Sequence, residues 1–168
     1  MNKFRIVCIL LLITNVSSKI RTYDDFINVL YDKLLLVIEG MSAEGQYKCY
    51  NSFKENKVIF SNMLKDIFNS TDFDDAINII IKDCLEIDPI LLLDIYANCH
   101  IDKLLTFITN YKIKEERIKI IKRIGNNIEN NAEEFQKGSN GVVRKKAIND
   151  KIRHVGKIIS AIFNIKFS

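Results

Sequence analysis

The residues of this chain that could take part in chemistry are four cysteines, two histidines and a short acidic run. Cys99 is followed by His100, and a thiol beside an imidazole is the pair that a cysteine nucleophile uses. Neighbouring residues of a helix point to different sides, however, so these two side chains would not face each other. Asp102 does not complete a metal site with them, because structural zinc sites use paired ligands at a regular spacing. The sequence therefore predicts neither a catalytic pair nor a metal site here.

The acidic run consists of Asp72, Asp74 and Asp75, and it lacks the glycine turn and the twelfth-position glutamate of a calcium-binding loop. Carboxylates in the first turn of a helix are stabilised by the helix dipole, which explains the run without a metal. Glycine-rich phosphate loops are also missing from the sequence. We therefore predict a protein without a cofactor and without enzymatic activity.

The N-terminus predicts the destination of the chain. Lys3 and Arg5 precede an apolar run over residues 6–13, which is followed by small and polar residues. This order is typical of a secretory signal peptide, and the run is too short for the ~20 apolar residues of a membrane-spanning helix. We predict a signal peptide over residues 1–18 and a secreted single domain over residues 19–168.

Loss of the signal peptide leaves Cys49, Cys84 and Cys99, an odd number of cysteines. In an oxidising compartment this implies one internal disulfide with a free thiol, or a disulfide-linked dimer through the unpaired cysteine. We favour Cys49 with Cys84, because a helix restarting at Ser52 and a following hairpin would return Cys84 to the loop of Cys49. The alternative is Cys84 with Cys99, which needs a bend near Asn98. A third reading is three reduced cysteines buried as small apolar residues.

The elements that must position these residues are predicted to be helices, since apolar residues recur at spacings of three and four and the chain has one proline. Thr22 and Asp25 form a capping box that begins the first helix, and Gly40 is expected to end it. Ser52 and Glu55 form a second such box and predict a restart. The sequence thus predicts an all-α, single-domain bundle of about five to seven amphipathic helices.

Further helix boundaries are predicted along the second half of the chain. Asp88 and Pro89 should end one helix and begin the next, because Asp caps well and Pro suits the first helical position. Helices are also predicted over residues 113–135 and about 142–165. Residues 138–141, with the sequence GSNG, are the clearest predicted loop between them.

Charge is distributed unevenly between the halves of the mature chain. Residues 19–110 hold 9 Lys and Arg against 15 Asp and Glu, whereas residues 111–168 hold 14 against 6. The halves are therefore expected to attract each other, and the basic half could alternatively recruit an acidic partner. The last helix supplies the candidate binding surface, which consists of Arg144, Lys145, Lys151, Arg153 and Lys157.

Basic amphipathic helices of this kind can bind anionic membranes or nucleic acid. The predicted signal peptide argues against nucleic acid as a partner. A membrane surface is disfavoured as well, because the apolar stripe of the last helix is expected to pack into the bundle. Asn69, Ser70 and Thr71 form a glycosylation sequon on a predicted turn, so Asn69 is a candidate modification site.

These observations predict a small secreted binding protein that acts through its surface on a macromolecular partner. One alternative is an extracellular carrier that holds an apolar ligand or lipid in a helical cavity, because the same Ile, Leu and Phe residues could line a pocket. Another alternative is a membrane-active protein whose basic C-terminal helix detaches from the bundle.

Overall fold

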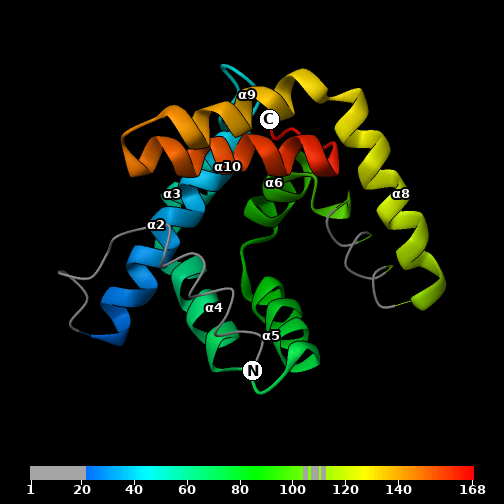
Figure 1. Cartoon of the computed structure of the whole chain (residues 1–168). Helices are drawn as coiled ribbons and strands as arrows, with labels where there is room; N and C mark the ends of the chain where they lie inside the picture. Colours follow the sequence, from blue (N-terminus) through cyan, green and yellow to red (C-terminus); the bar gives the residue numbers. More distant parts are fainter. Residues whose placement is uncertain (1–21, 104–105, 107–109, 111–112) are drawn as a thin grey trace.

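The computed structural model describes residues 22–103, 106, 110 and 113–168, and these residues fold mostly into helices (Figure 1). The helices are α2 (Tyr23–Met41), α3 (Lys48–Glu55), α4 (Lys57–Asn69), α5 (Phe73–Glu86), α6 (Pro89–Cys99), α8 (Lys114–Asn130), α9 (Ala132–Arg144) and α10 (Ile148–Phe163). The predicted all-α class is confirmed, although the described part alone contains more helices than the five to seven predicted. The predicted signal peptide lies outside the described residues.

Helix α2 begins where the sequence predicts. The Thr22 Oγ1 accepts a hydrogen bond from the Asp25 backbone N–H at 3.0 Å, and the Asp25 carboxylate accepts one from the Thr22 N–H at 3.0 Å. The helix continues through Gly40 to Met41. A Cβ on Gly40 would lie 1.9 Å from the Arg153 carbonyl oxygen, so this glycine permits close contact with α10 and does not end α2.

The predicted loop over residues 138–141 is wrong, because these residues form the middle of α9. A Cβ on Gly138 would lie 2.8 Å from Cγ1 of Ile158, and one on Gly141 would lie 2.2 Å from Nδ1 of His154. Both glycines therefore allow α9 to pack closely on α10, and neither of them lies in a turn. The last helix consequently begins at Ile148, later than predicted.

The predicted restart at Ser52 is also wrong. Ser52 lies inside α3, where its hydroxyl donates to the Lys48 carbonyl oxygen at 2.9 Å, and the next helix begins at Lys57. The boundary at Asp88 and Pro89 is confirmed. The Asp88 carboxylate accepts a hydrogen bond from the Ile90 N–H at 2.8 Å, and Pro89 is the first residue of α6.

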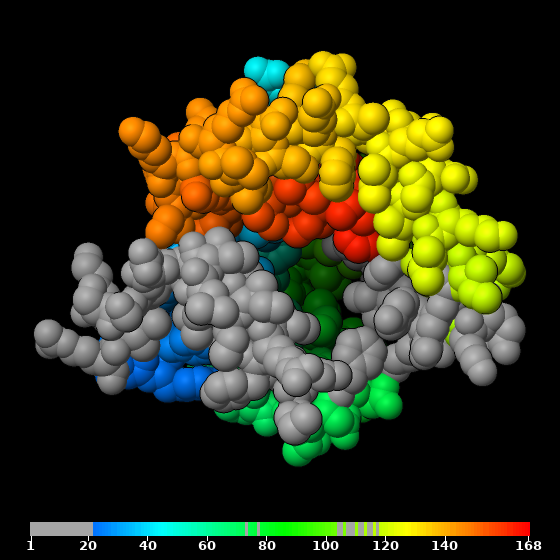
Figure 2. Space-filling view, viewed as in Figure 1, coloured from blue at the N-terminus to red at the C-terminus, as the bar shows by residue number. Residues whose placement is uncertain are grey.

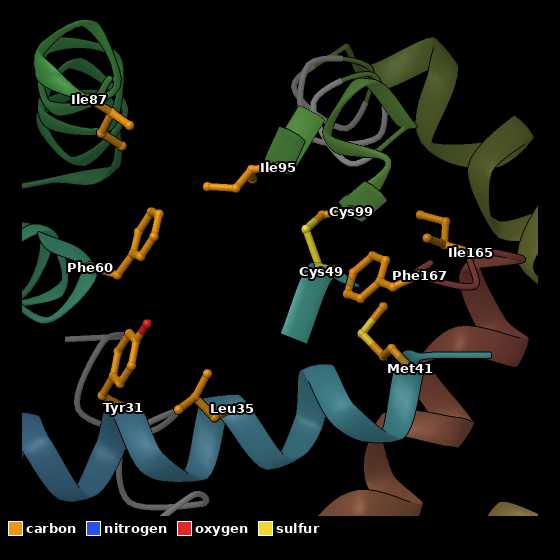
Figure 3. Close-up of a cluster of buried hydrophobic side chains, with 10 residues drawn as sticks. All are labelled: Tyr31, Leu35, Met41, Cys49, Phe60, Ile87, Ile95, Cys99, Ile165 and Phe167. Atoms are coloured by element: carbon orange, nitrogen blue, oxygen red, sulfur yellow. A yellow bond between two sulfur atoms is a disulfide. The ribbon is translucent and has the colours of Figure 1, made fainter. Parts of the chain in front are cut away.

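The core lies where α2, α3, α4 and α6 meet the C-terminal tail that follows α10 (Figure 3). Its buried members are Tyr31, Leu35, Met41, Cys49, Phe60, Ile87, Ile95, Cys99, Ile165 and Phe167. The tail is held by backbone hydrogen bonds: the Phe167 N–H donates to Met41 at 3.1 Å, and the Ser168 N–H donates to Asn98 at 2.9 Å. The tail therefore joins the end of α2 to the end of α6.

Candidate functional site

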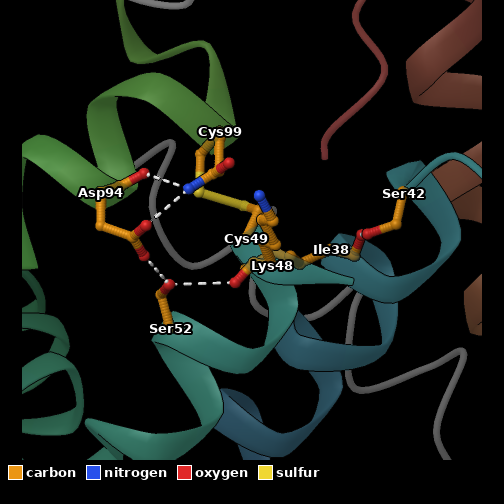
Figure 4. Close-up of a disulfide and its surroundings, with 8 residues drawn as sticks. Ile38, Ser42, Lys48, Cys49, Ser52, Asp94 and Cys99 are labelled. Atoms are coloured by element: carbon orange, nitrogen blue, oxygen red, sulfur yellow. Dashed lines mark hydrogen bonds between the residues drawn. A yellow bond between two sulfur atoms is a disulfide. The ribbon is translucent and has the colours of Figure 1, made fainter. Parts of the chain in front are cut away.

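The structure pairs Cys49 with Cys99, and their Cα atoms lie 5.1 Å apart, within the usual range for a disulfide. Both residues are buried, with 0% and 1% of their surface exposed (Figure 4). The favoured Cys49–Cys84 pairing and the alternative Cys84–Cys99 pairing are therefore both wrong. Helix α3 explains the error, because its eight residues extend over about 12 Å and separate Cys49 from the start of the α4–α5 hairpin.

Ser52 and Asp94 form a second link between α3 and α6 beside the disulfide (Figure 4). The Ser52 hydroxyl also hydrogen-bonds to an Asp94 carboxylate oxygen, and the other carboxylate oxygen accepts from the Asn98 side-chain amide at 2.7 Å. Sequence reasoning missed this contact because Ser52 followed by Glu55 looks like a helix cap. The arrangement links α3 to α6, and Ser52 is buried, with 7% of its surface exposed.

Cys84 is the free cysteine among the described residues, and it is half-buried on α5. Burial raises the pKa of its thiol, and the neighbouring carboxylate of Asp83 raises it further. His100 ends α6 in the left-handed conformation and Cys99 is already bonded, so these two residues do not form a thiol–imidazole pair.

The five predicted basic residues do not form one continuous surface. Arg153 is engaged with acidic neighbours: its Nε lies 2.8 Å from Oε2 of Glu39 on α2, and its Nη1 lies 3.2 Å from Oδ1 of Asp150. This contact joins the basic and acidic halves of the chain. Lys151 lies two residues earlier, about 200° around α10 from Arg153, and therefore faces another side.

Lys145 and Lys157 come together around His154, at the contact between α9 and α10. The pKa of His154 is lowered, mainly by burial and then by these two lysines. Arg144 is exposed at the end of α9. Positive charge therefore lies both at the end of α9 and along α10, and Arg153 is already paired with acidic residues.

Asn69 is exposed, as the glycosylation prediction requires, but it is the last residue of α4 and does not lie in a turn. Its side-chain oxygen accepts a hydrogen bond from the Tyr23 hydroxyl at 3.2 Å. Modification of Asn69 stays a prediction.

The feature that the sequence analysis did not identify is a run of exposed aliphatic side chains on two consecutive helices. Ile81 and Leu85 on α5 are 55% and 80% exposed, and Ile90 and Leu93 on α6 are 79% and 68% exposed. We call these four residues the α5–α6 apolar surface. In Figure 1, α5 lies beside α4 at one end of the molecule, and the same green end protrudes at the lower edge of Figure 2. The sequence could have indicated these exposed residues, because residues 79–95 contain more apolar side chains than one buried helix face can hold.

A cleft of about 300 Å³ lies between α8, the end of α10 and the residues after α6. Ile120 and Ile165 form part of its apolar lining, and both are buried. Lys103, Arg123 and Asn127 contribute polar groups to its lining. Mixed apolar and polar lining of this kind is compatible with a small amphipathic ligand, although the cleft is at the small end of the usual range for ligand pockets.

Comparison with models of known protein families, with curated proteins and with solved structures finds no match to the chain. Within the described ranges, none of the helices combines the length and the apolar character needed to cross a bilayer. The same residues contain no group of three or more His, Cys, Asp or Glu side chains placed to hold a metal ion.

Proposed function

We propose that the protein is a secreted binding protein without catalytic activity, and that it acts on a protein partner through the α5–α6 apolar surface. The observation that carries the proposal is the exposure of Leu85, Ile90 and Leu93 in a molecule that buries a separate core. Each Å² of apolar surface removed from water contributes about 25 cal/mol, so a partner that covers these side chains gains stability from them. Ile81 and Leu85 lie one turn apart on α5, and Ile90 and Leu93 lie one turn apart on α6, and neighbouring exposed aliphatic side chains of this kind are typical of interaction sites.

The carrier alternative is supported by the cleft beside α8, which has apolar residues together with the charged residues Asp102, Lys103 and Arg123 in its lining. A small molecule with an apolar part and a polar end is the class of ligand that this lining would suit. Native mass spectrometry of the secreted protein tests it. Ile124 also lines this cleft, so a copurified ligand mass that disappears in an Ile124→Lys variant would favour the carrier.

The membrane-active alternative has less support. Ile152 is buried and α10 packs against both α2 and α9, so its apolar stripe is already used inside the molecule. Binding of this stripe to a membrane would require α10 to leave two packed interfaces. Leakage of anionic vesicles at protein concentrations where the fold remains intact would argue against the surface-binding proposal.

The binding proposal is tested by screening the protein secreted from a eukaryotic host, expressed from the full-length gene, against an array of extracellular protein domains. The double substitution Ile90→Lys and Leu93→Lys is expected to lower the affinity of a hit about 100-fold, because two anchoring contacts are lost together. Thermal unfolding should change little, because both side chains are exposed in the wild type.

Val143→Lys is the matched control, because Val143 is an equally exposed aliphatic residue on α9, outside the α5–α6 apolar surface. It should leave the binding of the hit unchanged. Loss of binding in a variant with Arg144→Glu and Lys145→Glu, with no effect of the α6 substitutions, would contradict the proposed surface and assign the contact to the α9–α10 turn. The mass of the N-terminal peptide of the secreted protein separately tests cleavage after Ser18.

A further inference from the structure

The tail that follows α10 is bonded to both of the helices that the disulfide joins. The Ser168 N–H donates to the Asn98 carbonyl oxygen at 2.9 Å, on the residue before Cys99. The Ser168 carbonyl oxygen accepts a hydrogen bond from the Cys49 N–H at 2.6 Å. The backbone of one tail residue therefore links α3 to α6 beside the disulfide that links the same two helices.

Phe167 is the part of the tail that covers the disulfide. Its side chain is 4% exposed, and Figure 3 shows its ring beside the bonded cysteines. The ring is held in place because the Phe167 N–H donates to Met41 at 3.1 Å and the Phe167 carbonyl oxygen accepts from the Ala43 N–H at 2.9 Å. Since Cys49 and Cys99 are 0% and 1% exposed, a thiol in solution does not reach their sulfur atoms while the tail is bound.

Asn164 is the residue at which the tail leaves α10. Its φ is 52°, in the left-handed region that residues other than glycine and asparagine seldom adopt. Beyond it, the Ile165 carbonyl oxygen accepts from the Ser160 hydroxyl at 2.6 Å, and the exposed Lys166 pairs with Glu134 of α9. The attachment thus involves few residues, and a short segment of this kind detaches at a lower free-energy cost than the whole protein unfolds.

We propose that the tail, residues 165–168, is a latch that makes the Cys49–Cys99 disulfide a redox switch. The latch has to open before the bond can be reduced, because Phe167 covers the sulfur atoms. Reduction in turn weakens the latch, because the disulfide holds α3 and α6 at the spacing that Ser168 bridges. By linkage, a tail that stabilises the bond is stabilised by the bond to the same extent. The proposal does not rest on the α5–α6 apolar surface.

The reductant is a small thiol such as reduced glutathione. Its thiolate attacks one of the two sulfur atoms, so the bond between Cys49 and Cys99 breaks, a mixed disulfide forms and the other cysteine leaves as a thiolate. A second small thiolate then displaces the remaining cysteine from the mixed disulfide. The two cysteines take up the protons that the small thiols released. Two protein thiols are thus formed while two small thiols are oxidised to one disulfide.

The switch would change the part of the core where α2, α3 and α6 meet. With the bond formed, Ile165 and Phe167 stay buried and the tail joins α2 to α6. With the bond reduced, the tail would detach and expose both side chains together with Met41. An oxidising compartment therefore keeps this part of the core closed, and a reducing one loosens it.

The first test changes Asn164 in the purified protein, expressed from the full-length gene. Asn164→Val and Asn164→Gly both remove the side-chain contact with Asn131 at 3.4 Å, but only valine is strained at positive φ. Each variant is treated with dithiothreitol, and the two newly formed thiols are trapped with iodoacetamide and counted by intact mass. Asn164→Val should be reduced about tenfold faster than Asn164→Gly, because strain raises the fraction of open tail. Equal rates would overturn the proposal.

Urea distinguishes opening of the latch from unfolding of the whole protein. Opening of the tail exposes little surface, so the rate of reduction should rise less than about twofold between 0 and 1 M urea, whereas the unfolding equilibrium shifts about tenfold or more. Ile27→Val is the control, because Ile27 is buried about 20 Å along α2 from Met41. It should weaken the fold and leave the rate in water unchanged. A rate that follows global unfolding in urea, or an Ile27→Val rate equal to that of Asn164→Val, would overturn the latch.

The reciprocal effect is measured by amide hydrogen exchange of the oxidised and the dithiothreitol-reduced protein. The N–H groups of Phe167 and Ser168 should exchange at least tenfold faster after reduction, because the tail is then released. The Lys145 N–H, which donates to Gly141 at 3.0 Å at the end of α9, should exchange at the same rate in both states. Equal exchange of the tail amides in the two redox states would overturn the switch.

Discussion

Cys49 and Cys99 lie inside the core, so the bond between them holds α3 against α6 from a position that solvent does not reach. Their separation of 50 residues corresponds to about 4 kcal/mol of stabilisation in the chain-entropy estimate. We expect Cys49→Ser or Cys99→Ser to lower the free energy of unfolding by about that amount in urea titration. Cys84→Ser should change it by less than about 1 kcal/mol at protein concentrations where the chain is monomeric. An equal loss in all three variants would contradict the pairing.

His154 makes the stability dependent on pH. Burial and the nearby Lys145 and Lys157 lower its pKa in the folded state below the ordinary value of 6.5, against a smaller opposing effect of Asp150. The unfolded chain therefore binds more protons between the two pKa values, and stability rises with pH over that range. As the pH falls below about 6.5, His154 should thus make the folded state progressively less stable.

Urea unfolding of the wild type at pH 7.5 and at pH 5.5 measures this effect. Replacement of His154 by Phe removes the titrating group and keeps a ring against Gly141. The loss of stability between the two pH values should be smaller in this variant than in the wild type. An unchanged loss would show that other groups are responsible.

At the scale of the helices, four glycine contacts determine how α10 meets its neighbours. A Cβ on Gly156 would lie 2.2 Å from the Val37 carbonyl oxygen, and the obstacle is backbone that cannot rotate away. We expect Gly156→Ala to lower the free energy of unfolding by about 3 kcal/mol, because α2 and α10 would have to move apart.

Gly125 gives the matched control for this prediction. It also lies in a helix, α8, but a Cβ there would meet nothing within 4 Å. Gly125→Ala should therefore stabilise the protein by about 0.5–1 kcal/mol, since Ala loses less conformational entropy on folding. Destabilisation of similar size in both variants would argue against the close crossing of α2 and α10.

At the scale of the whole molecule, the described part is unevenly stabilised. Helix α10 packs extensively against both α2 and α9, whereas α5 packs mainly against α4 and exposes Ile81 and Leu85. Segments with few buried contacts open at a lower free-energy cost than the rest of a protein. Amide hydrogen exchange should therefore be faster in α4 and α5 than in α2 and α10. Protection of α5 equal to that of α10 would contradict this interpretation.

The sequence by itself determined the helical class and those boundaries that are encoded locally. The capping box of Thr22 and Asp25 and the Asp88–Pro89 boundary depend on residues within a few positions of each other, so the pattern was enough to predict them. The apolar spacing likewise predicted that the last helix would pack its apolar stripe into the bundle, and Ile152 on α10 is buried. Export and the partner remain predictions of the sequence.

Only the tertiary structure decided the meaning of the glycines and the pairing of the cysteines. Gly138 and Gly141 look like loop residues in the sequence. The side chains that require them to be glycine, Ile158 and His154, lie on α10, too far along the chain for a local pattern to include them. The disulfide joins residues 50 positions apart, and its choice depends on how α3 is placed against α6. Ile81 and Leu93 likewise look like core residues, and their exposure depends on which faces the other helices cover. These features arise from contacts between distant segments, which helical periodicity does not encode.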